Sequence, residues 1–373
     1  MTNLICSKKE LLKRMEIIET VISSHATIPI LSNFLLEIEN KKVKLAATDL
    51  EIGVRCYINN AKVNQTKDVI TLPAKRFIGI IKELPDKEDI EIKIDTEKNC
   101  QAEIKSGKSH FLILGTPKED FPDLPEFNES KSVNVNTKEF EEMVKKTIFS
   151  ISKDDTRPAL TGIYFVIEDN QINLVSTDGR RLSFIYRDCK TDHTSMKGIV
   201  LPKVINELLT ILNIEKSENF KINITENQIG FKVNDIILVS RLVDGKFPNY
   251  EQVIPKKNPI KVTINTDELL TAVKQLSLLT MEEGGAVRFL FTKNNLQLSI
   301  VSQGIGSGEV EIDIEFEGPD LDVAFNSKYI IDILKNLGED QVMFEMNGPA
   351  DSVVIRAIKD EKYLCVCMPV RIV

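Results

Sequence analysis

Residues 133–178 read VNVNTKEFEEMVKKTIFSISKDDTRPALTGIYFVIEDNQINLVSTD, and this stretch decides the fold because the chain contains its pattern three times. The other copies are residues 4–49, LICSKKELLKRMEIIETVISSHATIPILSNFLLEIENKKVKLAATD, and residues 262–303, VTINTDELLTAVKQLSLLTMEEGGAVRFLFTKNNLQLSIVSQ. Each copy predicts a short strand, a helix, a turn region and two strands joined by a polar hairpin. Repetition at a fixed period indicates an array of similar structural units.

The spacing of the copies is regular. Thr48-Asp49 recurs at Thr177-Asp178, an offset of 178 − 49 = 129 residues. A second helical segment also recurs, as LPAKRFIGIIKELP, LPKVINELLTIL and FNSKYIIDILKNL. We therefore predict an α+β protein of three similar domains, each a doubled strand–helix–strands unit, with boundaries at 1–127, 128–256 and 257–373.

Six helices are expected, two in each domain. Apolar residues recur at i, i+4 and i+7, as in Leu11, Met15 and Ile18, so each helix should bury one stripe and turn a polar face outward. Acidic residues share these polar faces, so the basic excess is small. The basic residues predicted there are Lys9, Lys13, Arg14, Lys75, Arg76, Lys82, Lys145, Lys146, Lys203, Lys274 and Lys335.

The bulk composition is that of a soluble globular protein, with 42% hydrophobic and 28% charged residues. The first residues, MTNLICSKKELLKR, lack the charge and apolar order of a signal peptide. Six scattered cysteines without a CxxC pair favour a reduced cytoplasm over a disulfide framework or a zinc site. The net charge of −8 argues against tight static binding to a DNA duplex, although a locally basic surface is compatible with looser contact.

No catalytic constellation is visible in the sequence. The chain has no GxxxxGK[ST] phosphate loop and no GxSxG nucleophile elbow, and its three histidines are far apart. GIGSG at 304–308 precedes a strand-like segment, so a tight turn is the simplest interpretation. Asp49 and Asp178 occupy equivalent repeat positions, which is typical of Asx-turn residues. We expect no bound metal or cofactor.

The threefold repeat, together with RPALTGIYF (157–165), STDGRRL (176–182), DGKFPNYEQVIP (244–255) and MPVRI (368–372), resembles the beta sliding clamps of bacterial DNA polymerase III. The resemblance spans the whole chain. It implies a head-to-tail homodimeric ring with helices inside and sheets outside. Such a ring encircles duplex DNA without reading its sequence, tethers the polymerase, is opened by a separate clamp loader and has no enzymatic activity.

The resemblance also implies a cleft that binds short peptides of the polymerase, the clamp loader and other DNA-handling proteins. Its apolar and methionine side chains suit several partner side chains, and arginines supply forked hydrogen-bond donors. The residues carried over by position are Arg157, Leu160, Thr177, Gly179, Arg181, Leu182, Pro248, Val253, Asn326, Tyr329, Val366, Met368, Pro369, Val370 and Arg371.

Two further sets of residues follow from the same resemblance. The dimer contact would use Phe111, Ile113, Leu278 and Leu279, which from the residues alone are equally compatible with ordinary core positions. His25, Pro158 and Ala159 depart from the family at its usual DNA-contact positions. The basic residues expected to face DNA, with His25 at one of those positions, are Lys9, Lys13, His25, Lys75, Lys145, Lys203 and Lys274.

The final residues, CMPVRIV, fit two interpretations. One is a last strand whose alternate residues enter a core. The other is the wall of the peptide cleft, and Pro369 favours it because proline removes a backbone donor from a regular central strand. At the level of the whole chain, the alternatives are a scaffold or adhesin of repeated domains that binds no DNA, and, with less support, a hydrolase.

Overall fold

The computed structural model describes residues 2–22, 28–96, 100–191, 195–280 and 285–371. The chain forms two compact units, whose boundaries both fall inside the middle repeat. Unit 1 comprises Met1–Lys138 and Lys203–Leu242, and unit 2 comprises Glu139–Pro202 and Val243–Val373. Each unit is described by itself.

The described residues contain six α-helices, two for each repeat, as predicted. Their buried side chains follow the apolar stripes, such as Leu11, Met15 and Ile18 in the first helix. Side-chain caps set two of the starts, because Ser7 and Asn265 each accept a hydrogen bond from the backbone amide three residues later. The helices are α1 (Lys8–Glu19), α2 (Ala74–Glu83), α3 (Thr137–Lys145), α4 (Pro202–Glu215), α5 (Thr266–Ser277) and α6 (Ser327–Leu337).

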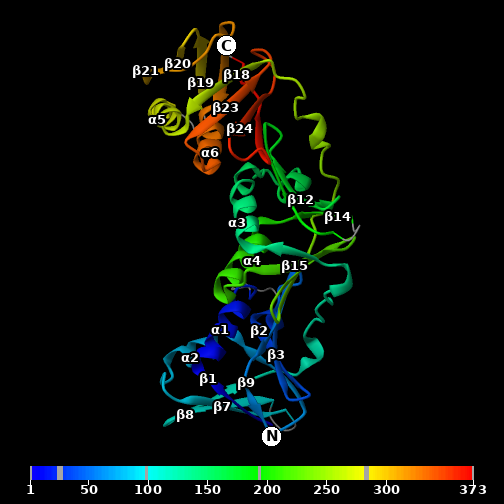
Figure 1. Ribbon diagram of the computed structural model, residues 1–373. Helices are drawn as coiled ribbons and strands as arrows, with labels where there is room; N and C mark the ends of the chain where they lie inside the picture. Colours follow the sequence, from blue (N-terminus) through cyan, green and yellow to red (C-terminus); the bar gives the residue numbers. More distant parts are fainter. Residues whose placement is uncertain (1, 23–27, 97–99, 192–194, 281–284, 372–373) are drawn as a thin grey trace. The chain divides into compact units, whose positions relative to one another are not determined.

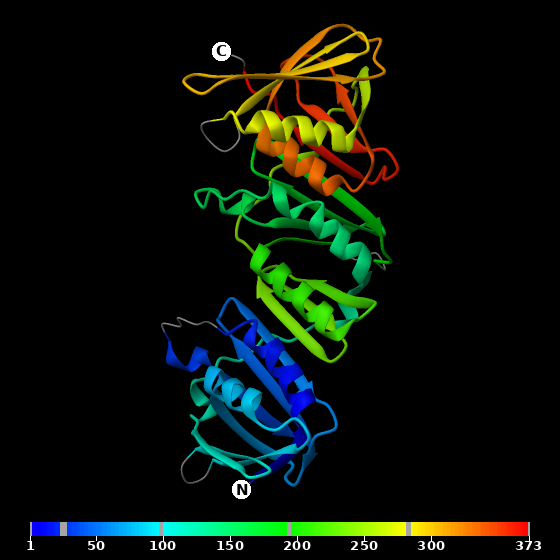
Figure 2. The ribbon, with the colours of Figure 1, turned by 90° about the vertical axis from the view of Figure 1, so that its left-hand side faces the viewer.

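Unit 1 contains two sheets, and helices α1 and α2 lie side by side in it (Figures 1 and 2). The smaller sheet has the order β5 (Lys62–Val63), β1 (Thr2–Ser7), β7 (Asp89–Asp95), β8 (Gln101–Ser106) and β9 (Ser109–Leu114). The larger sheet has the order β10 (Val133–Asn136), β15 (Asn219–Ile224), β16 (Gln228–Val233), β17 (Ile236–Arg241), β4 (Ile52–Ile58), β3 (Lys42–Thr48), β2 (Asn33–Glu39) and β6 (Lys67–Pro73).

Unit 2 repeats this arrangement, with α5 and α6 side by side (Figures 1 and 2). Its larger sheet has the order β14 (Met196–Val200), β11 (Ile163–Glu168), β12 (Gln171–Thr177), β13 (Arg181–Asp188), β25 (Tyr363–Cys367), β24 (Val353–Ala357), β23 (Gln341–Met346) and β18 (Ile260–Asn265). Its smaller sheet has the order β21 (Gly306–Asp313), β20 (Asn295–Ser302), β19 (Ala286–Thr292) and β22 (Leu321–Asn326).

Each large sheet joins strands from two consecutive repeats. In unit 1, β17 pairs with β4, so that Val239 lies opposite Gly53. In unit 2, β13 pairs with β25, so that Leu182 lies opposite Val366. Backbone hydrogen bonds therefore connect the repeats directly, and the linkers cross the faces of these composite sheets.

Two cations predicted on polar helix faces are instead buried, which corrects the sequence interpretation. Arg14 is 2% exposed, and its guanidinium lies 2.9 Å from Glu10, 3.2 Å from Glu215 and 3.4 Å from Asp235. Lys146 is 6% exposed, with its Nζ 2.9 Å from an Asp360 carboxylate oxygen. Glu215, Asp235 and Asp360 come from distant parts of the chain, and these carboxylates compensate the buried charges.

Across the described ranges, no helix combines the length and the apolar character needed to cross a membrane.

Candidate peptide-binding pocket

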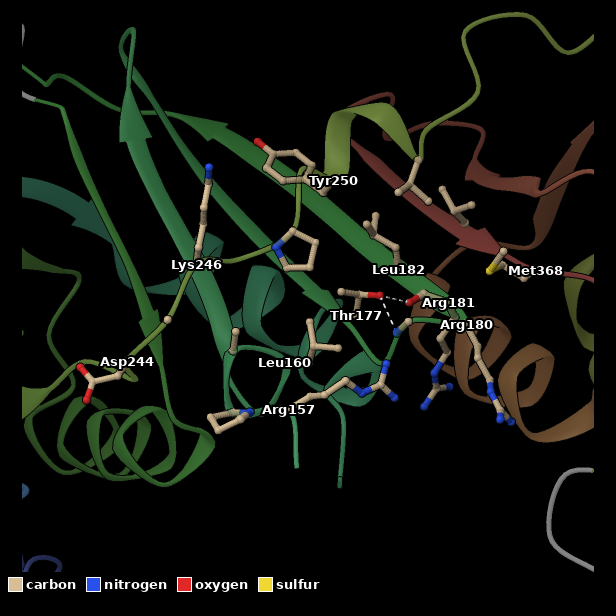
Figure 3. A pocket seen from close by; sticks show the side chains of 17 residues that line it. Arg157, Leu160, Thr177, Arg180, Arg181, Leu182, Asp244, Lys246, Tyr250 and Met368 are labelled. Atoms are coloured by element: carbon tan, nitrogen blue, oxygen red, sulfur yellow. Dashed lines mark hydrogen bonds between the residues drawn. The ribbon is translucent and has the colours of Figure 1, made fainter. Parts of the chain in front are cut away.

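Unit 2 contains a pocket of about 610 Å³ beside the β13–β25 pairing (Figure 3). Three segments of the second repeat, the linker to the third repeat and the final strand region form its walls. Its lining residues are Arg157, Pro158, Ala159, Leu160, Thr177, Gly179, Arg180, Arg181, Leu182, Asp244, Gly245, Lys246, Pro248, Tyr250, Val253, Val366 and Met368.

The inner wall of the pocket is apolar. Leu160, Leu182 and Val366 are 6%, 3% and 1% exposed and belong to one hydrophobic cluster. Leu160 ends a short 3-10 helix that begins with Pro158. Leu182 and Val366 are opposite one another on β13 and β25. The pocket wall therefore depends on strands that come from different repeats.

Aromatic stacking fixes the linker that forms the outer wall. The Phe247 ring stacks on Tyr164 with a centroid distance of 4.7 Å, and Tyr250 stacks on Phe184 at 5.7 Å. Burial, with a smaller contribution from Glu251, raises the pKa of the Tyr250 hydroxyl to about 12, so this side chain is neutral at physiological pH. Val253 follows and is 42% exposed, leaving an apolar surface at the mouth of the pocket.

A tight turn at Thr177–Arg181 shapes the adjoining edge. Asp178 Oδ1 accepts hydrogen bonds from the amides of Arg180 and Arg181, at 2.9 and 3.0 Å. Asp49 Oδ1 does the same in unit 1, from Glu51 and Ile52. Both aspartates are therefore Asx-turn residues, as predicted. Gly179 has φ +88°, a left-handed conformation that favours glycine.

Arg181 does not play the part predicted from the sequence, in which its guanidinium was a donor for the peptide. Its side chain is buried and donates to Asp178 at 3.1 Å, to Asp332 at 2.8 Å and to the Phe149 carbonyl at 2.6 Å. The Tyr329 ring covers its guanidinium, 4.5 Å away. Because three acceptors from separate segments converge on it, Arg181 supports the pocket from behind.

The tail reaches the pocket at Met368, which is 44% exposed. The Met368 amide donates to the Arg180 carbonyl at 2.9 Å, and the Val370 amide donates to the Ala324 carbonyl at 2.8 Å. Cys365 and Cys367, upstream in β25, are fully buried, as predicted. The tail therefore continues beyond a core strand as a tethered, partly exposed segment.

The remaining predicted cleft residues lie outside the pocket wall. Asn326 caps α6 by accepting from the amides of Lys328 and Tyr329. Tyr329 packs on Arg181, while Pro369, Val370 and Arg371 follow the last lining residue. The other predicted cleft residues all line the pocket, namely Arg157, Leu160, Thr177, Gly179, Arg181, Leu182, Pro248, Val253, Val366 and Met368.

Several lining residues were not named from the sequence. They are Pro158, Ala159, Arg180, Asp244, Gly245, Lys246 and Tyr250. The signal was present, because each falls inside RPALTGIYF, STDGRRL or DGKFPNYEQVIP. Carrying over only individually matched positions omitted the neighbours that the turn and the linker bring into the same wall.

The residues predicted to face DNA have different surroundings. Lys9, Lys75, Lys145 and Lys274 are exposed. Lys13 lies 2.9 Å from Glu215 and Lys203 lies 2.6 Å from Asp49, so both are held in ion pairs within unit 1. His25 lies outside the described residues.

The predicted dimer residues lie at the ends of the sheet order and beside α5. β9 is the edge strand of the small sheet in unit 1, and Phe111 on it is 40% exposed. Ile113 on the same strand is only 6% exposed. Leu278, just after α5, is 82% exposed, and Leu279 is partly buried. β21 is the edge strand of the small sheet in unit 2.

The described part of the chain offers no group of three or more His, Cys, Asp or Glu side chains that would hold a metal ion. Burial raises the pKa of the Cys365 and Cys367 thiols to about 11 and about 12, so both are protonated. The chemistry of the pocket is therefore that of apolar contact and hydrogen bonding.

Comparisons with known proteins agree along the whole chain. Family models of the DNA polymerase III beta subunit match residues 2–125 (N-terminal domain), 134–249 (central domain) and 251–371 (C-terminal domain). The beta sliding clamp of Chlamydia pneumoniae is 30% identical over 370 residues, covering 99% of this chain and 98% of the relative. That of Staphylococcus epidermidis is 31% identical over 360 residues, covering 94% of each.

A solved structure gives the same result. The DNA polymerase sliding clamp of Bacillus subtilis superposes with a TM-score of 0.91 at 27% identity, covering 100% of both chains. The chain thus has the three-domain α+β clamp fold, and it belongs to the family of DNA polymerase III beta subunits, the beta sliding clamps.

Proposed function

We propose that two copies of this chain close head to tail into a ring around duplex DNA, and that the pocket in unit 2 binds short segments of the polymerase, the clamp loader and other DNA-handling proteins. As a member of the sliding-clamp family, the chain is a non-catalytic processivity factor of DNA polymerase III. The cysteines of the described residues are free, which suits a reduced cytoplasm.

The pocket is the observation that carries the peptide-binding part of this proposal. Short linear motifs gain most of their affinity from a few apolar anchors in a desolvated pocket. Leu160, Leu182 and Val366 provide such a surface, while Met368 adapts to anchors of different shape. The cavity of about 610 Å³ has room for more than one anchor side chain.

The ring is supported by the repeats and by the unpaired sheet edges. Three similar domains per chain make a near-sixfold ring from two chains, and a closed ring leaves no free interface. β9 and β21 are edge strands, which need a partner or protection from aggregation. Exposed lysines at positions 9, 75, 145 and 274 suit weak, sequence-independent phosphate contacts, as sliding requires.

Charge substitution at the exposed dimer residues should yield folded monomers. Phe111→Asp and Leu278→Asp each place a carboxylate on a surface that is apolar and exposed in the single chain, 40% and 82% respectively. In the dimer that charge is buried without a partner, which costs several kcal/mol. Ile113 is unsuitable because its 6% exposure makes any substitution there a core defect.

Sedimentation velocity across a dilution series measures this effect. Ile358→Asp is the matched control, since Ile358 is 39% exposed outside the proposed interface, and it should remain dimeric. Circular dichroism and peptide binding by the monomeric variants report on their fold. A wild-type chain that is monomeric, or variants that stay dimeric at all concentrations, would contradict the ring.

A further inference from the structure

Three arginine side chains, those of Arg157, Arg180 and Arg181, lie along one edge of the pocket (Figure 3). Arg181 has its charge balanced by Asp178 and Asp332, at 3.1 and 2.8 Å. The other two side chains are exposed and differ from it in how their charge is compensated. This edge therefore carries positive charge that the protein itself does not neutralise fully.

The guanidinium of Arg157 lies directly over Gly179. A Cβ built on that glycine would be 3.1 Å from Arg157 Nη1, so the absence of a side chain there creates the space for the guanidinium. Its only printed carboxylate neighbour is Asp154, 3.7 Å away, in a pair whose side chains are 56% and 47% exposed. Asp154 already accepts two hydrogen bonds from Thr156, at 3.0 and 2.7 Å. Such a long, solvated ion pair is weak, so a ligand carboxylate competes readily for Arg157.

Arg180 has a fixed backbone and an exposed side chain. Its amide donates to Asp178 Oδ1 and its carbonyl accepts from Met368, both at 2.9 Å. Its side chain donates to the neutral phenol of Tyr329. Among the described residues, no carboxylate lies within ion-pair distance of the Arg180 guanidinium, whereas Arg157 and Arg181 each have at least one.

The opposite wall does not cancel this charge. Asp244 and Lys246 are the charged residues that the linker adds to the lining, and their charges are opposite. The Leu160, Leu182 and Val366 surface lies in the same pocket as the arginine edge. A ligand that is apolar at its anchors and anionic beside them complements both features.

We infer that the peptides bound by this pocket carry a carboxylate next to their apolar anchors, and that Arg180, together with Arg157, determines this specificity. The inference rests on the proposed peptide-binding function and adds to it the charge of the ligand. An aspartate or glutamate side chain and a C-terminal carboxylate present the same chemistry. Arginine suits either source, because its planar fork binds both carboxylate oxygens.

The test uses four forms of one acetylated probe peptide with leucine and phenylalanine anchors. An internal Asp or Asn is combined with a free or an amidated C-terminus, so the two sources of the carboxylate are separated. Binding to the full-length dimer is measured by fluorescence anisotropy at two salt concentrations. The variants are Arg180→Gln, Arg180→Lys and Arg157→Gln. Arg288→Gln is the charge-matched control, because Arg288 is an exposed arginine outside the pocket.

For the wild-type chain, at least one carboxylate form should bind roughly fivefold or more tightly than the neutral Asn-amide form at low salt, as expected for charge-assisted hydrogen bonds at a partly exposed site. Arg180→Gln should remove most of that difference without weakening the neutral form. Arg180→Lys should restore part of it, and Arg288→Gln should change neither probe. The carboxylate that carries the effect identifies its source.

The inference is overturned if Arg180→Gln leaves the preference for the carboxylate intact, or if the wild-type chain binds all four forms equally. Both outcomes leave the proposed peptide-binding function in place, because the neutral probe still binds. If no form binds the wild-type chain, while a positive-control clamp from Bacillus subtilis binds the same peptides, the proposed function itself fails.

Discussion

A chain truncated after Cys367 should lose about a hundredfold or more in affinity for a peptide from the polymerase tail, while remaining folded and dimeric. Met368 is the last residue of the tail that lines the pocket, and its amide is tethered to the Arg180 carbonyl. Its removal opens the apolar wall to water. β25 ends at Cys367 and keeps its pairing with β13 and β24, so the core remains intact.

The matched control for this truncation ends at Val370. That chain keeps Met368 and the hydrogen bond from the Val370 amide to Ala324, and it loses Arg371, which is exposed and does not line the pocket. Its affinity should stay within about threefold of the full chain, as for residues outside a hot spot. Isothermal titration calorimetry measures both. Equal binding by the chain that ends at Cys367 would mean that the tail is only the end of a strand.

Arg181→Met should lower the free energy of unfolding of the chain by about 3–5 kcal/mol, because it leaves a carboxylate without its buried cation. Arg181 is 7% exposed and donates to Asp332 and to the Phe149 carbonyl. Asp178 keeps two backbone donors in the variant, so the uncompensated group is chiefly Asp332. Urea unfolding followed by circular dichroism measures the loss.

Arg288→Met is the control for Arg181→Met. Arg288 also makes two hydrogen bonds to one carboxylate, at 2.8 and 2.7 Å, but its side chain is 46% exposed. An exposed pair of this kind contributes at most about 1 kcal/mol. Adding Asp332→Leu to Arg181→Met should recover part of the stability. If Arg181→Met costs no more than Arg288→Met, the buried network is not a support of the pocket.

Local features of the fold could be predicted from the sequence. The apolar stripe of Leu11, Met15 and Ile18 is buried in α1, since helical periodicity depends only on neighbours along the chain. The turns at Asp49 and Asp178 form as predicted because an Asx turn closes within three residues. The three-domain clamp fold followed from repeats visible in one sequence.

Features that depend on distant partners could not be predicted. Periodicity shows which face of a strand is buried but not which strand lies beside it, so the pairings of β17 with β4 and of β13 with β25 were not foreseen. Arg14 was placed on a polar face because Glu215 and Asp235, its buried partners, lie some 200 positions away in the sequence. Arg181 was assigned to the ligand for the same reason, since Asp332 belongs to another repeat.

The central claim, that the chain holds DNA by enclosing it, is tested most directly by linearising a loaded circle. The protein is loaded onto nicked circular DNA with a clamp loader and ATP, washed at high salt, and followed after a single restriction cut. Enclosure needs few phosphate contacts, so the account predicts that the ring stays on the intact circle and leaves the cut DNA within minutes, unless both ends are blocked. Release from intact and cut DNA at the same rate would contradict it.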